Sequence, residues 1–392
     1  MLSKSNFIVF IALVFGAYCC SPKGDGSLSE VIVNGNKMFF FSLNELSSNV
    51  ATIPLSSLVE SLELVQLETK KEAYFKVFFT TVTDKYIGVR QEGRPYLLFD
   101  RSGKFLGNVG SIGRGPGEYS ISLYDDIIDD KNELIYFTSI SSNRIHVYNT
   151  SGHFVKDIVS PQWLAKPKIF LTENILTVVH MAMKHENPEN AATDAANAIA
   201  IQFDVNTDEV LRELAPPPHL IARNFDGEIF NTRNAPGIFD FNHLSSQDTL
   251  YHFDVKNNKL LPVFSMSYST TDEKIWRQYI QINKDLILTA VVGKGLVATD
   301  LKNKTSSWIN VENDFLGKIH APLGVVTARN GFWVLNVQPE DLMEDIENRL
   351  AARGLSDTDK QALHRTLSAL KKDANNVVFI GKLKSEVKSK LW

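Results

Sequence analysis

Hydrophobic and polar positions alternate along the chain in five similar stretches. Each stretch is an apolar run that ends on Asp or Asn, followed by a short turn and a second apolar run. The Asp or Asn suits the start of a turn because its short side chain can bond backbone amides two residues further on. Period-two alternation around a short turn predicts a β-hairpin. The stretches are 96–109, 144–158, 200–214, 250–264 and 295–309.

The residues that precede these Asp or Asn positions recur at a nearly constant interval, with gaps of 46 to 55 residues. A sixth copy, at 375–384, has its equivalent residue at Ile380, which lies 81 residues after Thr299. Removing the 35 residues 339–373 restores a gap of 46. The chain therefore contains six units of one size. The five earlier positions are Phe99, Tyr148, Phe203, Phe253 and Thr299.

Residues 339–373 have a helical pattern instead. Apolar side chains recur every three or four residues in two runs, and Arg353 and Gly354 end the first run. Ser356, with Asp359 three residues later, is a variant of the capping box. These features predict a helical hairpin inserted in the last unit, whose apolar stripe either covers the edge of that unit or docks a partner. The apolar positions are Leu342, Ile346, Leu350, Leu363, Leu367 and Leu370.

Six units of this length, each with enough alternating sequence for four short strands, predict an all-β fold, a six-bladed β-propeller. A β-helix or a pair of sandwiches contains similar hairpins, but their repeat lengths fit less well. We expect the propeller to span 31–392. Residues 37–69 precede the first full blade, and part of this segment is expected to add a strand to the C-terminal blade and so close the ring.

The N-terminus has the pattern of a secretory signal peptide. Lys4 precedes an apolar run at 7–14, which is too short to span a bilayer. Cys19 and Cys20 are the two cysteines of the chain, so the folded body has no disulfide and no thiolate metal site. The stretch "GAYCC" resembles a bacterial lipobox. We predict a signal peptide at 1–20, acylation of Cys20 and a flexible tether at 21–30. Acylation at Cys19, or an unlipidated secreted protein, are the alternatives.

Two segments carry a family resemblance. "IPLSSLVESLELVQLET" and the later "LLFDRSGKFLGNVGSIGRGPGEY" resemble the six-bladed β-propeller lipoproteins of Gram-negative envelopes, which are related in architecture to NHL and TolB-like propellers. Residues 126–158 are similar to an NHL repeat. The resemblance implies a propeller anchored in the outer membrane, facing the periplasm or the cell surface. It supplies no catalytic residues.

Charge and composition limit the function. The net charge is −4, with basic and acidic residues nearly balanced, so nucleic acid is not an expected partner. We expect a monomeric, lipid-anchored recognition or scaffold module that binds a glycan, a peptide or a protein partner on the propeller face without catalysis. The alternative is a metal-dependent hydrolase or lyase with its site in the central channel. That chemistry needs polar side chains from several blades, whereas the identifiable inner strands are mainly apolar.

The loop "GSIGRGPGEYS" (111–121) is the first candidate site. Its glycines fit neither G-x-x-x-x-G-K-[ST] nor G-x-G-x-x-G, so no nucleotide site is expected. We predict a connector from the outer strand of one blade to the inner strand of the next. In the alternative interpretation, Arg114, Glu118 and Tyr119 contact a ligand.

Metal sites are not expected. Asp125, Asp126, Asp129 and Asp130 could hold Ca²⁺ through their oxygens, but turn and strand-start positions explain these residues better. His180 and His185 are five positions apart and do not form an H-E-x-x-H pair. The sequence thus predicts no cofactor. Residues 185–198, rich in Ala and Asn, are expected to form a long exposed loop in the third blade.

Overall fold

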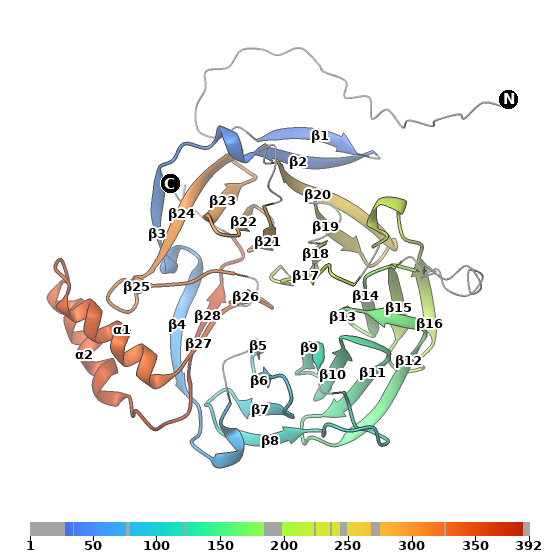
Figure 1. Ribbon diagram of the computed structural model, residues 1–392, viewed down its shortest axis with the longest axis horizontal. Helices are drawn as coiled ribbons and strands as arrows, with labels where there is room; N and C mark the ends of the chain where they lie inside the picture. The colour runs from blue at the N-terminus through green and yellow to red at the C-terminus, as the bar shows by residue number, and fades with distance from the viewer. Residues whose placement is uncertain are drawn as a thin grey trace, which may run out of the picture.

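The computed structural model describes residues 28–33, 35–75, 79–120, 122–183, 198–222, 225–235, 237–243, 249–267, 275–324 and 327–386. Their strands form six sheets arranged around a central axis (Figure 1). The six-bladed β-propeller predicted from the repeat is therefore confirmed. None of the helices in the described ranges has the length and apolar character needed to cross a membrane.

The first three blades each contain four strands that are consecutive in the sequence, with the first strand nearest the axis (Figure 1). Blade 1 contains β5 (Phe79–Val82), β6 (Tyr86–Arg90), β7 (Tyr96–Asp100) and β8 (Phe105–Val109). Blade 2 contains β9 (Leu123–Asp129), β10 (Leu134–Ser139), β11 (Ser141–Asn149) and β12 (Phe154–Ala165). Blade 3 contains β13 (Lys168–Thr172), β14 (Ile175–Val179), β15 (Ala200–Asp204) and β16 (Val210–Leu214).

N-terminal strands extend the next two blades. Blade 4 contains β17 (Ile229–Phe230), β18 (Phe239–His243), β19 (Thr249–Asp254) and β20 (Lys259–Ser267), followed by β2 (Asn36–Ser42) and β1 (Ser29–Val33). Blade 5 contains β21 (Arg277–Gln281), β22 (Leu286–Val291), β23 (Gly295–Asp300), β24 (Thr305–Asn313) and β25 (Ile319–His320), and β3 (Val50–Pro54) pairs with β24. Since β1 begins at Ser29, regular structure starts inside the tether predicted at 21–30.

Blade 6 closes the ring. It contains β26 (Ala328–Arg329), β27 (Phe332–Val337) and β28 (Val377–Leu383), and its outer strand is β4 (Val59–Gln66) from the other end of the chain. In this antiparallel pair Leu64 lies opposite Phe379. The predicted closing strand within 37–69 is therefore confirmed. It explains why the sixth sequence copy has no second apolar run of its own.

The repeat positions found in the sequence are core positions. All six side chains are at most 2% exposed, and the Asp or Asn that follows five of them begins a turn. In blade 1, Asp100 Oδ1 accepts hydrogen bonds from the backbone N of Ser102 (2.9 Å) and Lys104 (3.0 Å). Asn149, Asp204, Asp254 and Asp300 accept backbone N–H bonds in the same way.

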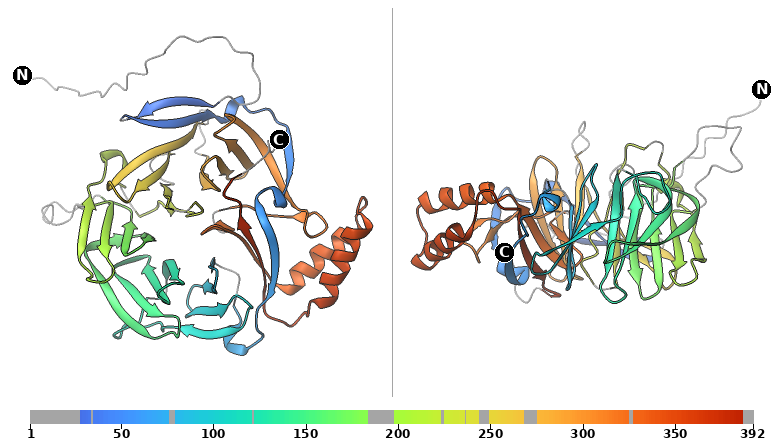
Figure 2. Two further views of the ribbon diagram at one scale, coloured as in Figure 1. Left: turned by 180° about the vertical axis from the view of Figure 1, so that it is seen from behind. Right: turned by 90° about the horizontal axis from the view of Figure 1, so that it is seen from below.

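Two α-helices lie between β27 and β28 in the chain, α1 (Pro339–Ala351) and α2 (Asp357–Ala369), and they project from the rim (Figure 2). Ser356 caps α2, since its Oγ accepts a hydrogen bond from Asp359 N at 3.1 Å. The apolar stripe faces the propeller: Leu342, Ile346 and Leu363 are at most 2% exposed and pack in the core of blades 5 and 6. The short 3₁₀ helices are η1 (Leu43–Glu45), η2 (Leu55–Ser57), η3 (Lys71–Ala73) and η5 (Pro218–Leu220).

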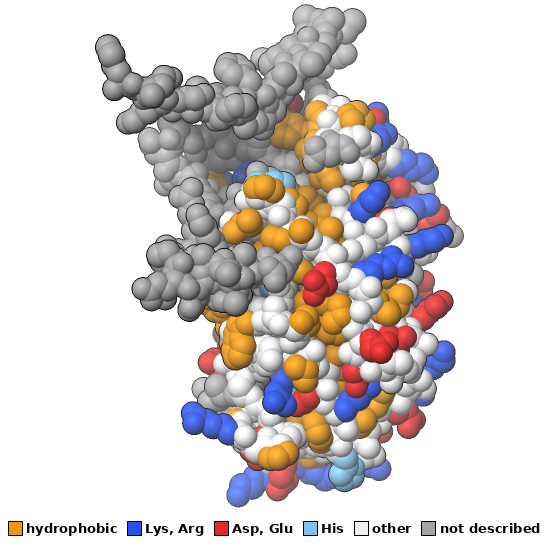
Figure 3. Space-filling model, turned by 90° about the vertical axis from the view of Figure 1, so that its right-hand side faces the viewer, with side chains coloured by type: hydrophobic (Ala, Val, Ile, Leu, Met, Phe, Trp, Pro, Cys, Tyr) orange, Lys and Arg blue, Asp and Glu red, His pale blue; other side chains and the backbone are white. Residues whose placement is uncertain are grey.

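The outer strands carry both apolar and charged side chains on the surface of the protein. On the side that carries β12 and β16, apolar side chains alternate with charged ones (Figure 3). Trp163 on β12 is 63% exposed and Leu211 on β16 is 44% exposed. Hydrophobic residues are therefore not confined to the six blade cores.

Candidate functional site

Charged side chains are buried at the centre of the ring. Asp125 and Asp126, adjacent on β9, are both 0% exposed. Arg90, Arg233 and Arg329, from blades 1, 4 and 6, surround them and are at most 8% exposed. We call these five residues the central ion cluster. The expectation of mainly apolar inner strands is wrong here. Asp125 and Asp126 lie near the start of a strand, as expected, but turn chemistry does not explain them, because their partners come from distant parts of the chain.

Asp125 joins blade 2 to three other blades. Its Oδ1 pairs with Arg329 Nη2 of blade 6, and its Oδ2 lies 3.5 Å from Arg233 Nη1 of blade 4. The backbone N of Ile169, in blade 3, donates to Oδ2 at 2.8 Å. Burial alone would raise the pKa of Asp125, but the two guanidinium groups outweigh it and hold the pKa well below its usual range. Asp125 is therefore ionised, and its carboxylate holds four blades together at the axis.

Asp126 joins blades 1 and 2. Its Oδ1 lies 3.2 Å from Arg90 Nε, and its Oδ2 accepts a hydrogen bond from Tyr96 Oη at 3.0 Å. Arg90 Nη1 also donates to the carbonyl oxygens of Leu123 (3.0 Å) and Tyr124. Burial and the nearby carboxylate raise the pKa of Tyr96 well above its usual value, so its hydroxyl stays protonated and donates.

Arg233 crosses the channel from the connection between β17 and β18. Its Nη1 donates to Ile169 O at 2.5 Å, its Nη2 to Asp126 O at 3.1 Å and its Nε to Asn330 Oδ1 at 3.0 Å. Its backbone is in the left-handed region, with φ of 54°, which L residues other than Gly seldom adopt. The four inter-blade contacts, including the pair with Asp125, hold the side chain across the axis.

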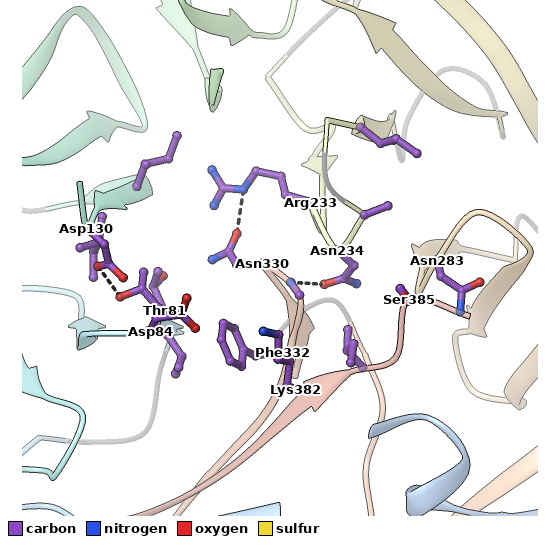
Figure 4. Close-up of a pocket in the computed structure, with 18 of the residues that line it drawn as sticks. Thr81, Asp84, Asp130, Arg233, Asn234, Asn283, Asn330, Phe332, Lys382 and Ser385 are labelled. Atoms are coloured by element: carbon purple, nitrogen blue, oxygen red, sulfur yellow. Dashed lines mark hydrogen bonds between the residues drawn. The ribbon is translucent and has the colours of Figure 1, made fainter. Parts of the chain in front are cut away.

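A cavity of about 840 Å³ opens at the end of the channel where turns join the first and second strands of the blades. We call it the turn-side pocket. Figure 4 shows Arg233 and Asn330 pointing to its centre, with Asp130, Asn234 and Lys382 around them. All six blades contribute to the wall; one residue from each, in order, is Asp84, Asp130, Phe170, Asn234, Asn283 and Lys382.

The wall of the turn-side pocket is fixed by hydrogen bonds between blades. Asn234 Nδ2 donates to Gln281 O and Ala328 O, both at 2.9 Å, and its Oδ1 accepts from Gly331 N at 3.1 Å. Asp130 Oδ1 accepts from Thr83 Oγ1 at 2.7 Å. Such contacts keep the polar groups of the wall in place without a ligand.

The loop at 111–121 lies between β8 and β9, outer strand to inner strand, as predicted for a connector. Tyr119 is 1% exposed; its Oη donates to Val109 O at 2.8 Å and accepts from Tyr96 N at 2.9 Å. Glu118 Oε2 accepts from Gly115 N at 2.7 Å. Tyr119 and Glu118 thus have structural contacts, whereas Arg114 is exposed. A ligand contact by Arg114 or Glu118 stays a prediction.

The other sequence candidates are separate from each other. Asp129 Oδ1 accepts from the backbone N of Lys131 (3.0 Å) and Asn132 (3.2 Å), as expected of a turn residue. His180 is 0% exposed, and burial lowers its pKa to about 4. Cys20, His185 and the loop at 185–197 lie outside the described residues. Within the described ranges, no three His, Cys, Asp or Glu side chains are grouped as metal ligands.

The sequence contains one signal that points to the centre of the ring. "TRN" at 232–234 and "ARN" at 328–330 both place an Arg–Asn pair at or next to an inner strand, and "ARN" occurs once more at 222–224. In the structure, Arg233 and Arg329 point to Asp125, and Asn234 and Asn330 form hydrogen bonds between blades 4 and 6. A repeated dipeptide without hydrophobic periodicity is easily missed.

Comparisons with known proteins show the fold more clearly than an activity. A family described as "Domain of unknown function (DUF4934)" matches residues 38–382. A Bacteroides fragilis structure described as an exported protein is 13% identical, covers 86% of this chain and 100% of its own, and has a TM-score of 0.59. A DUF4221 family member from Bacteroides vulgatus is 12% identical, with coverage of 83% and 99% and a TM-score of 0.42. No curated protein matches the sequence significantly.

Proposed function

Because the chain belongs to the DUF4934 family, whose description assigns no activity, we propose its function from the site: a recognition module that binds a glycan, a peptide or a protein partner on the propeller face without catalysis. The observation that carries the proposal is the turn-side pocket of about 840 Å³, to which all six blades contribute. This volume lies in the range of about 300–1,000 Å³ typical of ligand sites.

The lining of the turn-side pocket supports recognition of a ligand that is both polar and apolar. Amide and charged groups from Asn283, Asp84 and Lys382 line the same pocket as Phe170 and Phe332. Aromatic faces bind sugar rings and apolar side chains, and convergent polar groups fix orientation. This combination suits a glycan or a peptide segment.

The chemistry of the central carboxylates favours binding over metal-dependent hydrolysis. A metal in the channel would need carboxylate oxygens free to coordinate it. The two oxygens of Asp125 are engaged by Arg329, Arg233 and Ile169 N, and those of Asp126 by Arg90 and Tyr96. Adding a divalent cation beside three guanidinium groups would be electrostatically unfavourable.

The proposal includes the cell envelope as location, with Cys20 acylated and the chain anchored in the outer membrane. Support comes from the signal-peptide pattern before "GAYCC", from the resemblance to NHL and TolB-like propeller lipoproteins, and from the Bacteroides fragilis structure described as exported. Metabolic labelling with radioactive palmitate tests it: wild type should be labelled and Cys20→Ala should not. Label retained by Cys20→Ala but lost in Cys19→Ala would move the site to Cys19.

Binding is tested with glycan and peptide arrays. The probe is the purified protein, and the test variant carries Asp84→Arg with Lys382→Glu, which reverses two exposed charges on the pocket wall. The matched control is Lys302→Glu, an exposed lysine in the turn between β23 and β24. We expect the wild type and the control to bind the same array members and the double variant to lose them. Equal binding by all three proteins would contradict the proposal.

A further inference from the structure

A second cavity, of about 340 Å³, lies at the other end of the inner strands. Its wall includes the beginnings of β5, β9, β13 and β17, whereas the turn-side pocket is lined by the ends of β5 and β9. The central ion cluster lies between them, since Arg233 lines the first cavity and Arg90 and Arg329 line the second. We call the second cavity the basic pocket. It is distinct from the site of the proposed function.

Three cationic side chains line the basic pocket, and each has unsatisfied donors. Nη2 of Arg90 and Nε of Arg329 are buried without a hydrogen-bond partner among the described residues. Lys168 is 8% exposed, and its Nζ lies 3.8 Å from the centre of the Tyr124 ring, with no hydrogen bond or ion pair within the described part of the chain. Buried donors of this kind are costly unless something accepts from them.

The charges in this region do not balance. Four basic side chains, Arg90, Lys168, Arg233 and Arg329, surround the two carboxylates of Asp125 and Asp126, so basic groups outnumber acidic ones by two. Glu228, on the wall, is neutralised by Lys166 at 2.7 Å and also accepts from Tyr124 Oη. Glu92 is exposed at the rim. The buried excess therefore remains to be compensated by an anion.

Burial and charge repulsion act together on Lys168. Burial, together with repulsion from Arg329 and Arg90, lowers the pKa of Lys168 to about 7, although Asp125 and Glu228 oppose the shift. A bound anion would favour the protonated amine and relieve the repulsion among the three cations.

Apart from Ser122 and Asn231, the rest of the wall is apolar, which limits the kind of anion. It is formed by the side chains of Phe79, Leu123, Tyr124, Ile140, Ile229 and Phe230. An inorganic ion would leave these groups in contact with water. A small organic anion with an apolar or aromatic body would cover them and place its charge beside the cations.

We propose that the basic pocket binds a small carboxylate with an apolar or aromatic body, whose carboxylate accepts hydrogen bonds from Lys168, Arg90 and Arg329. Guanidinium N–H donors match the planar geometry of a carboxylate. The body packs on Tyr124, Phe230 and their apolar neighbours. The proposal does not depend on the turn-side pocket, because Lys168 does not line it.

The test uses 4-fluorobenzoate as probe, followed by ¹⁹F NMR with the full chain. The matched uncharged ligand is 4-fluorobenzyl alcohol, and inorganic phosphate is the competitor without an apolar body. We expect saturable binding of the benzoate, binding of the alcohol weaker by about tenfold or more, and poor competition by phosphate. Absence of saturable benzoate binding, equal binding of the alcohol, or phosphate binding tighter than benzoate would overturn the proposal.

Protein variants assign the binding to this cavity. Lys168→Met keeps the length of the side chain and removes the charge, and should weaken benzoate binding by about tenfold, whereas Lys302→Met is the exposed control and should leave it unchanged. Glu92→Gln removes a rim carboxylate that repels the ligand, so it should strengthen binding by about twofold at low salt. Benzoate binding that is the same in Lys168→Met and Glu92→Gln as in wild type would overturn the assignment.

Discussion

Arg233 and Asp126 are joined across the central channel: Nη2 of Arg233, from blade 4, donates to the carbonyl oxygen of Asp126, in blade 2, at 3.1 Å. The same guanidinium group contacts Asp125 and donates to Asn330 in blade 6. It also donates to Ile169 O in blade 3, so a single side chain connects three blades to its own. In most of the ring, by contrast, blades meet through apolar contacts between neighbours.

Replacing Arg233 by Met should destabilise the whole propeller. The change leaves Asp125 with one guanidinium partner instead of two in a buried site, so we expect the free energy of unfolding to fall by about 3 kcal/mol. Urea unfolding followed by tryptophan fluorescence measures it. Arg353→Met, at an exposed position after α1, is the control and should unfold like wild type. Equal stability of the two variants would contradict the structural role of Arg233.

The charge of Asp125 should make stability depend on acid pH. Burial alone would raise the pKa of Asp125, but Arg233 and Arg329 bring it below its ordinary value of 3.8. The ionised carboxylate therefore contributes stability that is complete above about pH 4 and is lost as the pH falls toward the folded-state pKa.

Asp125→Asn tests this dependence. We expect a loss of about 3 kcal/mol at pH 7, because two cations lose their buried partner, and a smaller loss at pH 3. Urea unfolding at the two pH values measures the difference. Asp357→Asn, whose side chain is 97% exposed, should have little effect at either pH. A loss that is the same at pH 3 and pH 7 would show that packing, not charge, explains the effect.

Replacing Lys168, unlike replacing Asp125, should stabilise the fold at neutral pH. Its folded-state pKa is about 7, below the ordinary 10.5, so the unfolded chain binds more protons between these values and stability should rise as the pH increases from 7 to about 10.5. Lys168→Met should raise the free energy of unfolding at pH 7 by about 2 kcal/mol. This gain is smaller than the full pKa shift of Lys168 implies, because the contact between the Lys168 amine and the Tyr124 ring is lost. Denaturation at pH 7 and pH 10 measures the effect, and a variant less stable than wild type at pH 7 would contradict it.

Deleting residues 30–70 should abolish cooperative folding. The deletion removes β4 and leaves the edge of β28 unpaired. It also removes the strands that extend blades 4 and 5. Differential scanning calorimetry of the truncated chain should show no sharp transition. A truncated protein that melts like the full chain would refute the closure by β4.

Replacing residues 339–373 by a short Gly–Ser linker should lower the melting temperature. The helices bury Leu342, Ile346 and Leu363 against blades 5 and 6, so their removal exposes apolar surface. Thermal melts measure the change. Unchanged stability, combined with loss of an envelope protein that co-purifies with the wild type, would instead favour the docking role for the hairpin.

The blades could be predicted from the sequence because their signals are local. Phe99 and Asp100 are adjacent, and the alternation that buries Phe99 and the turn that Asp100 begins need no information from elsewhere in the chain. The cap of α2 by Ser356 is equally local. Closure by β4 was predictable for another reason: a ring of blades needs its open edge covered, and a segment before the first full blade was available to cover it.

The central site could not be predicted in the same way. Asp125 meets Arg329, which is 204 positions away, and Arg233 meets Ile169, which is 64 positions away. Adjacent acidic residues at the start of a strand look like turn chemistry until the cations that neutralise them are known. The binding properties of both pockets depend on such long-range contacts, whereas each repeat carries the pattern of its own blade.

The pairing of β4 with β28 has a consequence for how the chain reaches its final shape. Gln66 Nε2 donates to Asn376 O at 3.3 Å, and these residues are 310 positions apart. A polypeptide that emerges amino end first cannot close the ring until almost the whole chain has emerged, because β4 has no pairing strand before β28 is available. Whatever compartment receives this protein must therefore protect a long unfinished intermediate from associating with its neighbours.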